Sequence, residues 1–282
     1  MTNRRSGSQQ TDAARTTPEY TGERMVPEQS DPMTFWEHIY RYRFAAQFVL
    51  GQRVLDIACG EGYGTAALAS AGAARVIGID LDESACAHAR DKYHVDARPG
   101  RAEQIPLPDG SVDVIVSFET IEHVEKPEVF LDECRRVLAA GGQLIISTPN
   151  RDVFHQAGRH NDFHCSEMTL EEFQGAVRRR FDRSVYYSQV PQRAAWWSAR
   201  SLAAVDSPWF RPKGCWRVRE AARMMVCRHI RGAVPEEFRL SPVRAVLAHD
   251  RPLASLFNPY VVRSWSPESR ERPLYVIAVA QR

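Results

Sequence analysis

The sequence comprises 282 residues, of which 44% are hydrophobic and 26% charged, and its formal net charge is +2, as is usual for a globular protein. No run of about 18 apolar residues occurs, and no apolar segment follows the charged N-terminus. We therefore predict no membrane-spanning helix, no secretory signal and no binding to membranes or nucleic acid, and we expect a cytoplasmic protein.

Residues 1–18 are polar and are predicted to form a disordered tail. Apolar residues at helical spacing over 34–50 predict an amphipathic helix. From residue 53 onward, short apolar strands alternate with helical patterns, which is typical of βαβ units. The expected strands are 53–58, 75–79, 95–98, 112–117 and 143–148, and the expected helices are 63–72, 83–93 and 127–139.

The C-terminal part of the chain continues this pattern and then interrupts it. A Thr169 to Glu172 capping signature opens a predicted helix over 169–180, and a strand over 184–190 follows. The predicted fold class is α/β, with a doubly wound, mostly parallel seven-stranded sheet and a helical insertion before the last strand. The predicted divisions are the tail 1–18, a core 19–190 with an N-terminal lid helix, a substrate-recognition insertion 191–272 and a last core strand 273–282.

The near-neutral total hides an uneven distribution of charge. Residues 191–272 contain 15 Lys and Arg against 7 Asp and Glu, so this segment carries a charge of +8. Nearly all of these cations are arginines, which bind phosphate and carboxylate in a bidentate manner. We expect the segment either to face an acidic ligand or to be an ordinary solvated surface.

The cysteines occur without a CxxC pair or a matching histidine spacing. This pattern argues against a zinc site and against a disulfide framework. We expect buried free thiols at all six positions, which are Cys59, Cys86, Cys134, Cys165, Cys215 and Cys227.

The stretch VLDIACGEGYG is a predicted strand that ends in a glycine-rich turn, where a ligand can approach the backbone closely. Gly60, Gly62 and Gly64 do not match the GxGxxG spacing of dinucleotide-binding folds. Asp56 lies before the glycines, where it would repel a diphosphate and suit a cofactor with a positive ammonium group. Asp80, at the end of the next strand, stands where a carboxylate binds ribose hydroxyls.

Four segments in order, VLDIACGEG, VIGIDLD, RAEQIPLPDGSVDVIVSFETIEHV and RRVLAAGGQLIISTPN, resemble the motifs of class I S-adenosylmethionine-dependent methyltransferases. The resemblance covers about residues 20–190. It implies a Rossmann-like fold and S-adenosyl-L-methionine as cofactor, with S-adenosyl-L-homocysteine as product. The segments TGERMVPE and EHIYRYRF also resemble a bacterial subgroup associated with glycan and natural-product assembly.

The resemblance also implies which residues contact the cofactor. It places Asp56 beside the methionine part, Asp80 on the ribose and Leu81 against the adenine. The sequence departs from the family at Ala58, which is often Gly, and at Arg101, which is often Asp. The implied cofactor-binding residues are Asp56, Ala58, Cys59, Gly60, Gly62, Asp80, Leu81, Ala102, Glu103, Ser117, Phe118 and Glu119.

A hydroxyl acceptor must lose a proton, so a general base is expected beside the glycine turn. His123 follows the fourth strand and His164 the fifth, and histidine titrates near neutral pH. We predict His164 and His123 as catalytic residues. The alternatives are that His123 only orients its loop, and that His164 and Glu167 cap the helix that begins at Thr169.

A divalent metal site is a further alternative, formed by His160, Asp162, His164 and Glu167. Its spacing matches no zinc signature, so we predict no metal. The substrate is expected to contact the helix over 34–50, the loop after the fifth strand and the insertion, through Tyr40, Arg43, His160, Trp196 and Trp197.

These features predict a methyltransferase that acts on a hydroxyl group of a small molecule, a sugar or a secondary metabolite, by in-line displacement. Transfer to the nitrogen, carboxylate or carbon of an acidic metabolite is the alternative. A cofactor-binding scaffold without activity and a dehydrogenase are more remote alternatives. The expected partner is a small-molecule acceptor, and under the alternative reaction this acceptor is acidic or nucleotide-linked. The aromatic residues of 191–272 could contact the substrate or could instead form the interface of a homodimer.

Overall fold

The computed structural model describes residues 24–30, 32–191, 241–247, 260–266, 269 and 272–282. The predicted tail 1–18 lies outside these residues, and so does most of the predicted insertion, including Trp196 and Trp197.

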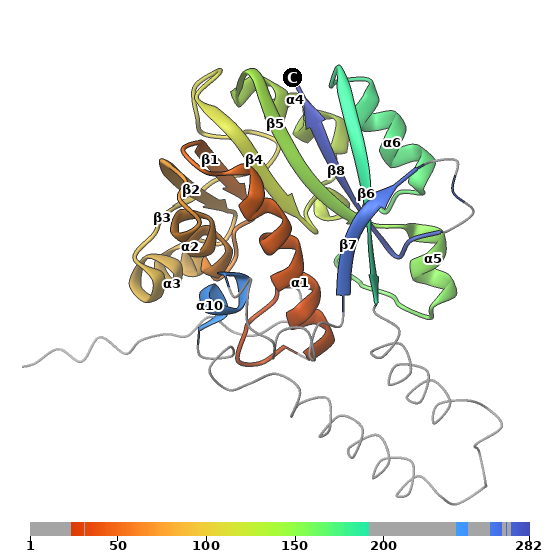
Figure 1. Cartoon of the computed structure of the whole chain (residues 1–282), viewed down its shortest axis with the longest axis horizontal. Helices are drawn as coiled ribbons and strands as arrows, with labels where there is room; N and C mark the ends of the chain where they lie inside the picture. The colour runs from red at the N-terminus through yellow and green to blue at the C-terminus, as the bar shows by residue number, and fades with distance from the viewer. Residues whose placement is uncertain (1–23, 31, 192–240, 248–259, 267–268, 270–271) are drawn as a thin grey trace, which may run out of the picture.

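Eight strands form one sheet: β1 (Arg53–Ile57), β2 (Arg75–Asp80), β3 (Asp96–Pro99), β4 (Val112–Phe118), β5 (Leu138–Pro149), β6 (Arg183–Pro191), β7 (Tyr260–Trp265) and β8 (Tyr275–Gln281). Their order is β3-β2-β1-β4-β5-β8-β6-β7 (Figure 1). β1 to β5 pair in parallel. β8 runs antiparallel to its neighbours β5 and β6, and β7 runs antiparallel to β6. The predicted α/β class and its doubly wound parallel half are confirmed.

The sheet contains one strand more than predicted. β7 lies within the segment that was expected to be a helical insertion, and it adds to the sheet edge beside β6. Its sequence YVVRSW is rich in β-branched and aromatic residues, which favour strands. The insertion is therefore only partly helical among its described residues.

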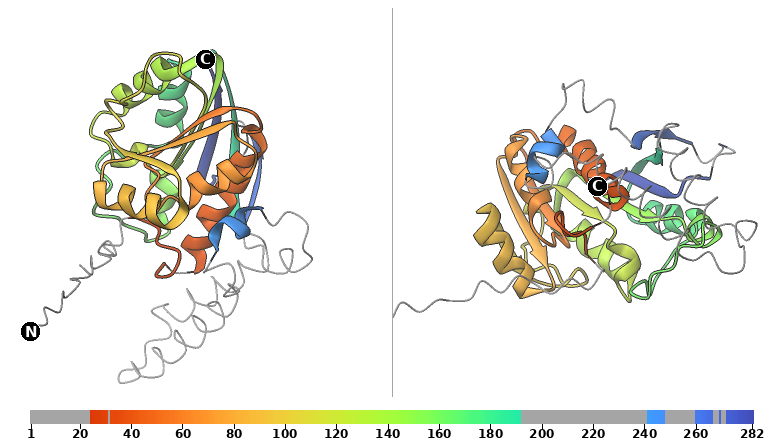
Figure 2. Two further views of the ribbon diagram at one scale, coloured as in Figure 1. Left: turned by 90° about the vertical axis from the view of Figure 1, so that its left-hand side faces the viewer. Right: turned by 90° about the horizontal axis from the view of Figure 1, so that it is seen from below.

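The helices are α1 (Pro32–Ala45), α2 (Tyr63–Ser70), α3 (Glu83–Tyr93), α4 (Pro127–Val137), α5 (Arg151–Gln156), α6 (Leu170–Arg178) and α10 (Pro242–Leu247), with the 3-10 turns η1 (Ala46–Phe48) and η2 (Ile121–His123). One apolar core joins α1, α2 and α10 to one face of the sheet. A second core joins α4 and α6 to the opposite face (Figure 2). Because strand residues alternate in direction, Val54 belongs to the first core and Leu55 to the second.

The observed helix ends follow local chemistry. The Thr169 hydroxyl accepts from the amide of Glu172, whose side chain accepts from the Thr169 amide, so the predicted capping box opens α6. The helix expected over 34–50 is instead α1 followed by η1, and α5 was not expected at all. None of the helices in the described segments is long and apolar enough to cross a bilayer.

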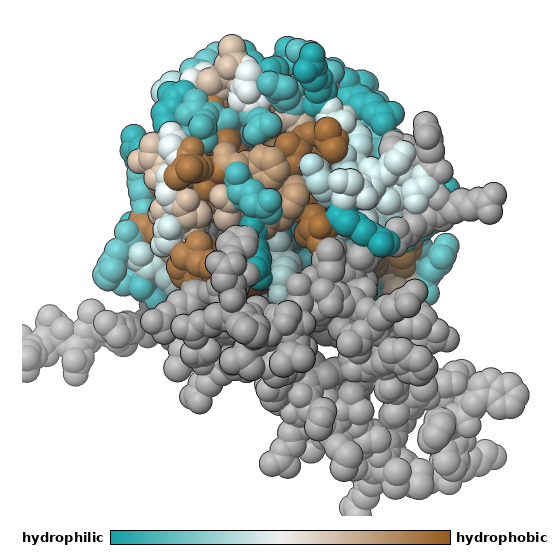
Figure 3. Space-filling view, viewed as in Figure 1, coloured by the Kyte–Doolittle hydropathy of each residue, from teal (hydrophilic) through white to brown (hydrophobic). Residues whose placement is uncertain are grey.

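The surface and the thiols complete this description. On the face shown in Figure 3, hydrophilic residues follow the upper rim and hydrophobic residues gather nearer the centre.

Cys59, Cys86 and Cys134 are buried free thiols, as predicted. Cys165 is exposed, contrary to the prediction, because it lies in the loop between α5 and α6. Cys215 and Cys227 lie outside the described residues.

Candidate functional site

A cleft of about 960 Å³ opens at the carboxyl ends of the parallel strands. Ile57 from β1, Asp80 from β2 and Phe118 from β4 form its sheet side. In doubly wound sheets ligands bind at this edge, where the first strand turns into its helix. The cleft is therefore the candidate functional site.

The glycine turn between β1 and α2 forms one wall of the cleft. Gly60 has a φ of +50°, and a Cβ added to it would meet no atom within 4 Å. A Cβ on Gly64 would instead overlap the ring of Tyr42 from α1. Ala58 also has a positive φ, +59°, which explains why glycine suits this position. Gly60 thus leaves room for a ligand, whereas Gly64 leaves room for a helix.

Asp80 connects the glycine turn to the end of β2. Its carboxylate accepts hydrogen bonds from the amide of Gly60, at 2.8 Å, and from the amide of Asp82, at 3.0 Å. Asp80 also lines the cleft. The predicted pairing of the turn with an acid on the next strand is therefore present in the fold.

Asp56 differs from the expectation that its carboxylate faces the cofactor. The side chain is fully buried and does not line the cleft. It accepts hydrogen bonds from the Tyr42 hydroxyl, at 3.1 Å, and from the Thr65 hydroxyl, at 2.7 Å. Burial raises the pKa of Asp56 to about 7, although the two hydroxyl groups oppose this change. Asp56 therefore joins α1 and α2 beneath the turn.

The other predicted cofactor-binding residues fall into two groups, those that line the cleft and those that do not. Gly62 and Ser117 do not line the cleft; Ser117 is fully buried, and a Cβ on Gly62 would overlap Ala89 of α3. Those that do line it are Ala58, Cys59, Gly60, Asp80, Leu81, Ala102, Glu103, Phe118 and Glu119.

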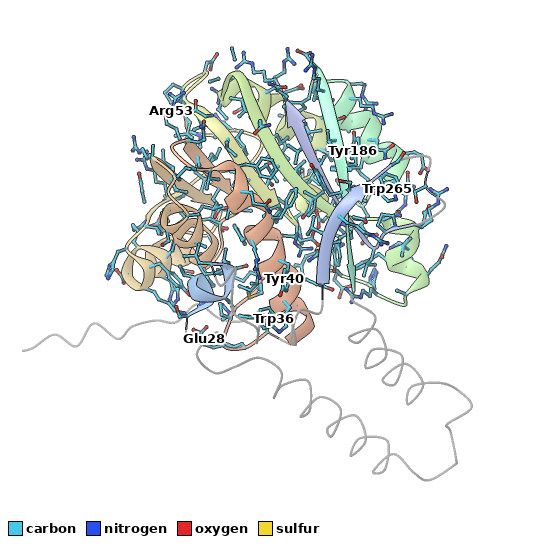
Figure 4. The ribbon with its side chains drawn as sticks, viewed as in Figure 1. Glu28, Trp36, Tyr40, Arg53, Tyr186 and Trp265 are labelled. Atoms are coloured by element: carbon cyan, nitrogen blue, oxygen red, sulfur yellow. The ribbon has the colours of Figure 1, made fainter. Side chains whose placement is uncertain are left out.

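Helix α1 contributes to the cleft through a different face from the one predicted. Tyr40 is buried against Trp36, with ring centroids 5.8 Å apart (Figure 4), and Arg43 lies over the Tyr40 ring. Neither Tyr40 nor Arg43 lines the cleft. The α1 residues that do are Thr34, Glu37, His38 and Tyr42. Three of them recur at every fourth position, so helical spacing was the signal that could have identified this face.

The segment 24–30 closes the cleft beside α3. The Arg24 guanidinium forms an ion pair with Asp82 at 2.5 Å, and Lys92 pairs with Glu28 at 2.8 Å. Hydrogen bonds from Ser84 and from Arg24 lower the pKa of Asp82 to about 2. Arg24 and Asp82 both line the cleft.

The predicted bases His123 and His164 both line the cleft and lie side by side. The rings of His123 and His164 lie edge to face, with centroids 4.8 Å apart. Nδ1 of His164 lies 2.6 Å from a carboxylate oxygen of Glu167, and Nε2 lies 3.0 Å from the amide nitrogen of Asn161. Thr169 and Glu172 cap α6, so the alternative that His164 and Glu167 form that cap is wrong.

The predicted metal alternative is not assembled. His160 and Asp162 form an exposed pair at 3.0 Å, separate from the buried pair of His164 and Glu167. Within the part of the chain that the structure describes, Glu122, His123 and His164 do bring ligand atoms within 4.8 Å of one another. In this arrangement, however, both ring nitrogens of His164 already have partners.

Glu119, directly after β4, also lines the cleft. It has a φ of +53°, which is unusual for a residue with a side chain. Its carboxylate accepts a hydrogen bond from Ser147 at 2.9 Å and lies 3.7 Å from the buried guanidinium of Arg41. Burial, together with the charge of Glu119, raises the pKa of the neighbouring Glu122. Sequence reasoning missed Arg41, which reaches this site from α1.

Solved structures share this fold at low sequence identity. A structure described as a possible histamine N-methyltransferase from Thermotoga maritima has a TM-score of 0.55, covers 88% of this chain and 92% of its own, and is 16% identical. The structure of the cyclase SpnF has a TM-score of 0.50 and covers 88% of this chain and 80% of its own, again at 16% identity. These likenesses concern the fold alone.

The sequence matches are more specific. Residues 55–146 match the family model for a methyltransferase domain. A "probable S-adenosylmethionine-dependent methyltransferase" of Mycolicibacterium smegmatis is 44% identical over 158 residues, which are 54% of this chain and 60% of that protein. Residues 55–146 therefore form a methyltransferase domain, and over 158 residues the chain is similar to S-adenosylmethionine-dependent methyltransferases. S-adenosylmethionine is the cofactor of this methyltransferase family.

A second kind of relative has a named reaction. The ubiquinone biosynthesis O-methyltransferase of Maricaulis maris is 39% identical over 107 residues, which are 36% of this chain and 42% of that enzyme. The chain therefore spans about 40–60% of the length of these curated relatives.

Proposed function

We propose that this protein transfers a methyl group from S-adenosylmethionine to a hydroxyl group of a small molecule, a sugar or a secondary metabolite. The observation that carries the proposal is that His164 lines the same cleft as Gly60 and Asp80 and that its Nδ1 pairs with the carboxylate of Glu167. A carboxylate that accepts from one imidazole nitrogen keeps the ring proton there and leaves the other nitrogen as a hydrogen-bond acceptor, which is the form that can take a hydroxyl proton.

The residues of the cleft fit the cofactor. Gly60 leaves open space where a side chain would stand, and the Asp80 carboxylate lies beside it at the end of β2. Leu81, which is 67% exposed, offers an apolar surface for a purine ring. The cofactor supplies, when bound, a methyl group on a positive sulfur, and Glu119 places a carboxylate on the same cleft wall.

The chain's own residues would then orient the acceptor, exclude water and accept its proton. His164 is the proposed base, and His123 packs against its ring. The segment 24–30 and α1 narrow the opening from the other side. Holding the acceptor oxygen in line with the methyl carbon is the main catalytic contribution expected of such a site.

Transfer to an acidic metabolite is the second candidate. Arg24, Arg101 and Arg159 all line the cleft, so a phosphate, carboxylate or nucleotide-linked acceptor would find cationic partners there. The Arg-rich segment 191–272 adds to this candidate through its composition. A cytoplasmic location, a role in natural-product biosynthesis and a homodimer remain parts of the proposal.

Calorimetry and an acceptor screen test the function. We expect S-adenosylmethionine to bind, and Asp80→Ala to weaken binding by about 1.5–3 kcal/mol because a charged hydrogen-bond partner is lost. Mass spectrometry of a metabolite screen should detect a product larger by one methylene, formed more slowly by His164→Ala. Absence of cofactor binding would overturn the proposal, and binding without methylation of any acceptor would leave a non-catalytic cofactor-binding scaffold.

A further inference from the structure

The Glu167 carboxylate lies between two histidines from different parts of the chain. One oxygen lies 2.6 Å from Nδ1 of His164, and the other lies 2.6 Å from Nε2 of His155 on α5. We infer that Glu167 is a positioning residue, which holds His164 in the tautomer with the proton on Nδ1 and so leaves Nε2 as the proton acceptor. This inference rests on the proposed function.

The partners of His164 agree on one tautomer. The amide nitrogen of Asn161 can only donate, so Nε2 of His164 accepts from it at 3.0 Å. The orientation of that amide is set by its oxygen, which accepts from the backbone amide of Phe163 at 3.0 Å. Nδ1 therefore carries the proton and donates it to Glu167. The Asn161 donor also marks where an acceptor hydroxyl would donate, since Asn161 and His164 both line the cleft.

The surroundings of the Glu167 side chain hold its carboxylate in place beside the His164 ring. The side chain of Glu167 is 11% exposed, compared with 5% for His164 and 51% for His155. The Glu167 backbone carbonyl accepts from the Arg151 guanidinium at 3.1 Å, which ties it to the start of α5. The base therefore lies inside the cleft wall, and its supporting carboxylate faces a histidine at the surface.

The loop that carries His164 is also fixed relative to His123. The backbone carbonyl of Glu122 accepts hydrogen bonds from the amides of Cys165, at 3.0 Å, and Ser166, at 2.9 Å. The Ser166 hydroxyl donates to the carbonyl of Val124 at 2.7 Å. These bonds join the loop after β4 to the loop before α6, so both histidines keep their places.

This arrangement defines the proton transfer. As the bond between the acceptor oxygen and the methyl carbon forms and the carbon–sulfur bond breaks, the hydroxyl proton passes to Nε2 of His164. The sulfur leaves as a neutral thioether, and the positive charge now lies on the imidazole. The Glu167 carboxylate stabilises that charge while remaining ionised, as an orienting acid does beside a catalytic histidine.

Nuclear magnetic resonance of the imidazole nitrogens tests the tautomer without any acceptor. In uniformly nitrogen-15-labelled full-length protein, at a pH where the ring is neutral, His164 should carry its proton on Nδ1. The His164→Gln variant identifies its signals. Glu167→Gln should shift the ring toward the Nε2-protonated form, whereas Glu171→Gln, a change at an exposed glutamate on α6, should leave it unchanged. A wild-type ring protonated on Nε2 would overturn the inference.

The relative activities of two Glu167 variants distinguish an effect of the carboxylate charge from an effect of side-chain packing. Gln has the shape of Glu without its charge, and Asp keeps the charge on a shorter side chain. With a hydroxyl acceptor found in the screen, Glu167→Gln should lower kcat by about 10²-fold, the usual contribution of a positioned base, and Glu167→Asp by less. Cofactor affinity by calorimetry should not change in either variant.

The opposite order, with Gln more active than Asp, would show a packing role and overturn the inference. If the wild type methylates no hydroxyl compound, the proposed function fails, while the tautomer measurement still decides whether Glu167 positions His164.

Discussion

At the scale of single residues, two glycines of one turn have separate physical roles. Gly64 allows α1 to approach, because a Cβ there would overlap Tyr42, whereas the position of a Cβ on Gly60 is open. We predict that Gly64→Ala lowers the free energy of unfolding by about 1–3 kcal/mol through overpacking. Urea unfolding followed by circular dichroism measures this change.

Gly60→Ala should behave differently. Its φ of +50° makes a side chain cost about 1 kcal/mol in the free energy of unfolding. The added methyl would stand in the cleft, so S-adenosylmethionine affinity should fall as well, which calorimetry detects. Equal affinities for Gly60→Ala and the wild type would contradict the placement of the cofactor beside the turn.

Asp56 predicts a pH dependence of stability. Its pKa is about 7 in the fold against 3.8 for an ordinary solvated aspartate, so the folded state retains a proton that the unfolded chain releases. Its unfavourable contribution therefore grows as pH rises from about 4 and is complete above about 7. Relative to Asp56→Asn, the wild type should lose about 2–3 kcal/mol of unfolding free energy between pH 5 and pH 8.

Urea unfolding at both pH values measures this difference. Asp113→Asn is the matched control, since Asp113 pairs with Arg53 at the surface and its pKa is lowered by that guanidinium. The difference between the wild type and Asp113→Asn should stay constant from pH 5 to pH 8. A constant difference for Asp56→Asn as well would mean that the Asp56 carboxyl is ionised throughout.

At the scale of elements, the N-terminus of α6 combines stability with the site. Thr169 begins the helix two residues after Glu167. Thr169→Ala should lower the free energy of unfolding by about 1 kcal/mol, because the Glu172 amide loses its acceptor. Thr169→Ser keeps the hydroxyl and should lose much less in the same denaturation experiment. Equal losses in the two variants would assign the effect to the methyl group.

Sequence patterns predicted where the helices and strands lie more accurately than which side of a helix faces the cleft. The alternation of apolar strands and helices identified β1 to β5 and the helices between them, because each depends on neighbouring residues. Strand β7 was not predicted, because its sequence YVVRSW is short and its pairing partner β6 lies about 70 residues earlier in the chain. The face of α1 was assigned wrongly, since both Tyr40 and Tyr42 fit a helix and only packing distinguishes them.

At the scale of the whole molecule, the C-terminal strand completes the sheet. β8 lies between β5 and β6, and its residues Tyr275 to Ala280 are buried. A chain that ends at residue 272 should lack a cooperative unfolding transition, because the sheet would expose two inner edges and two apolar faces. Near-ultraviolet circular dichroism and urea titration test this, with Gln281→Ala at the exposed strand end as a control that should unfold cooperatively.

The sequence by itself indicated the methyl donor, because four motifs in order, from VLDIACGEG to RRVLAAGGQLIISTPN, resemble those of S-adenosylmethionine-dependent methyltransferases. It also predicted His123 and His164 as site residues, and both line the cleft. Only the tertiary structure decided that Asp56 lies beneath the turn, that Arg41 reaches the site, and that Glu167 joins His155 to His164. Side-chain direction depends on what packs against each element, and no local pattern contains that information.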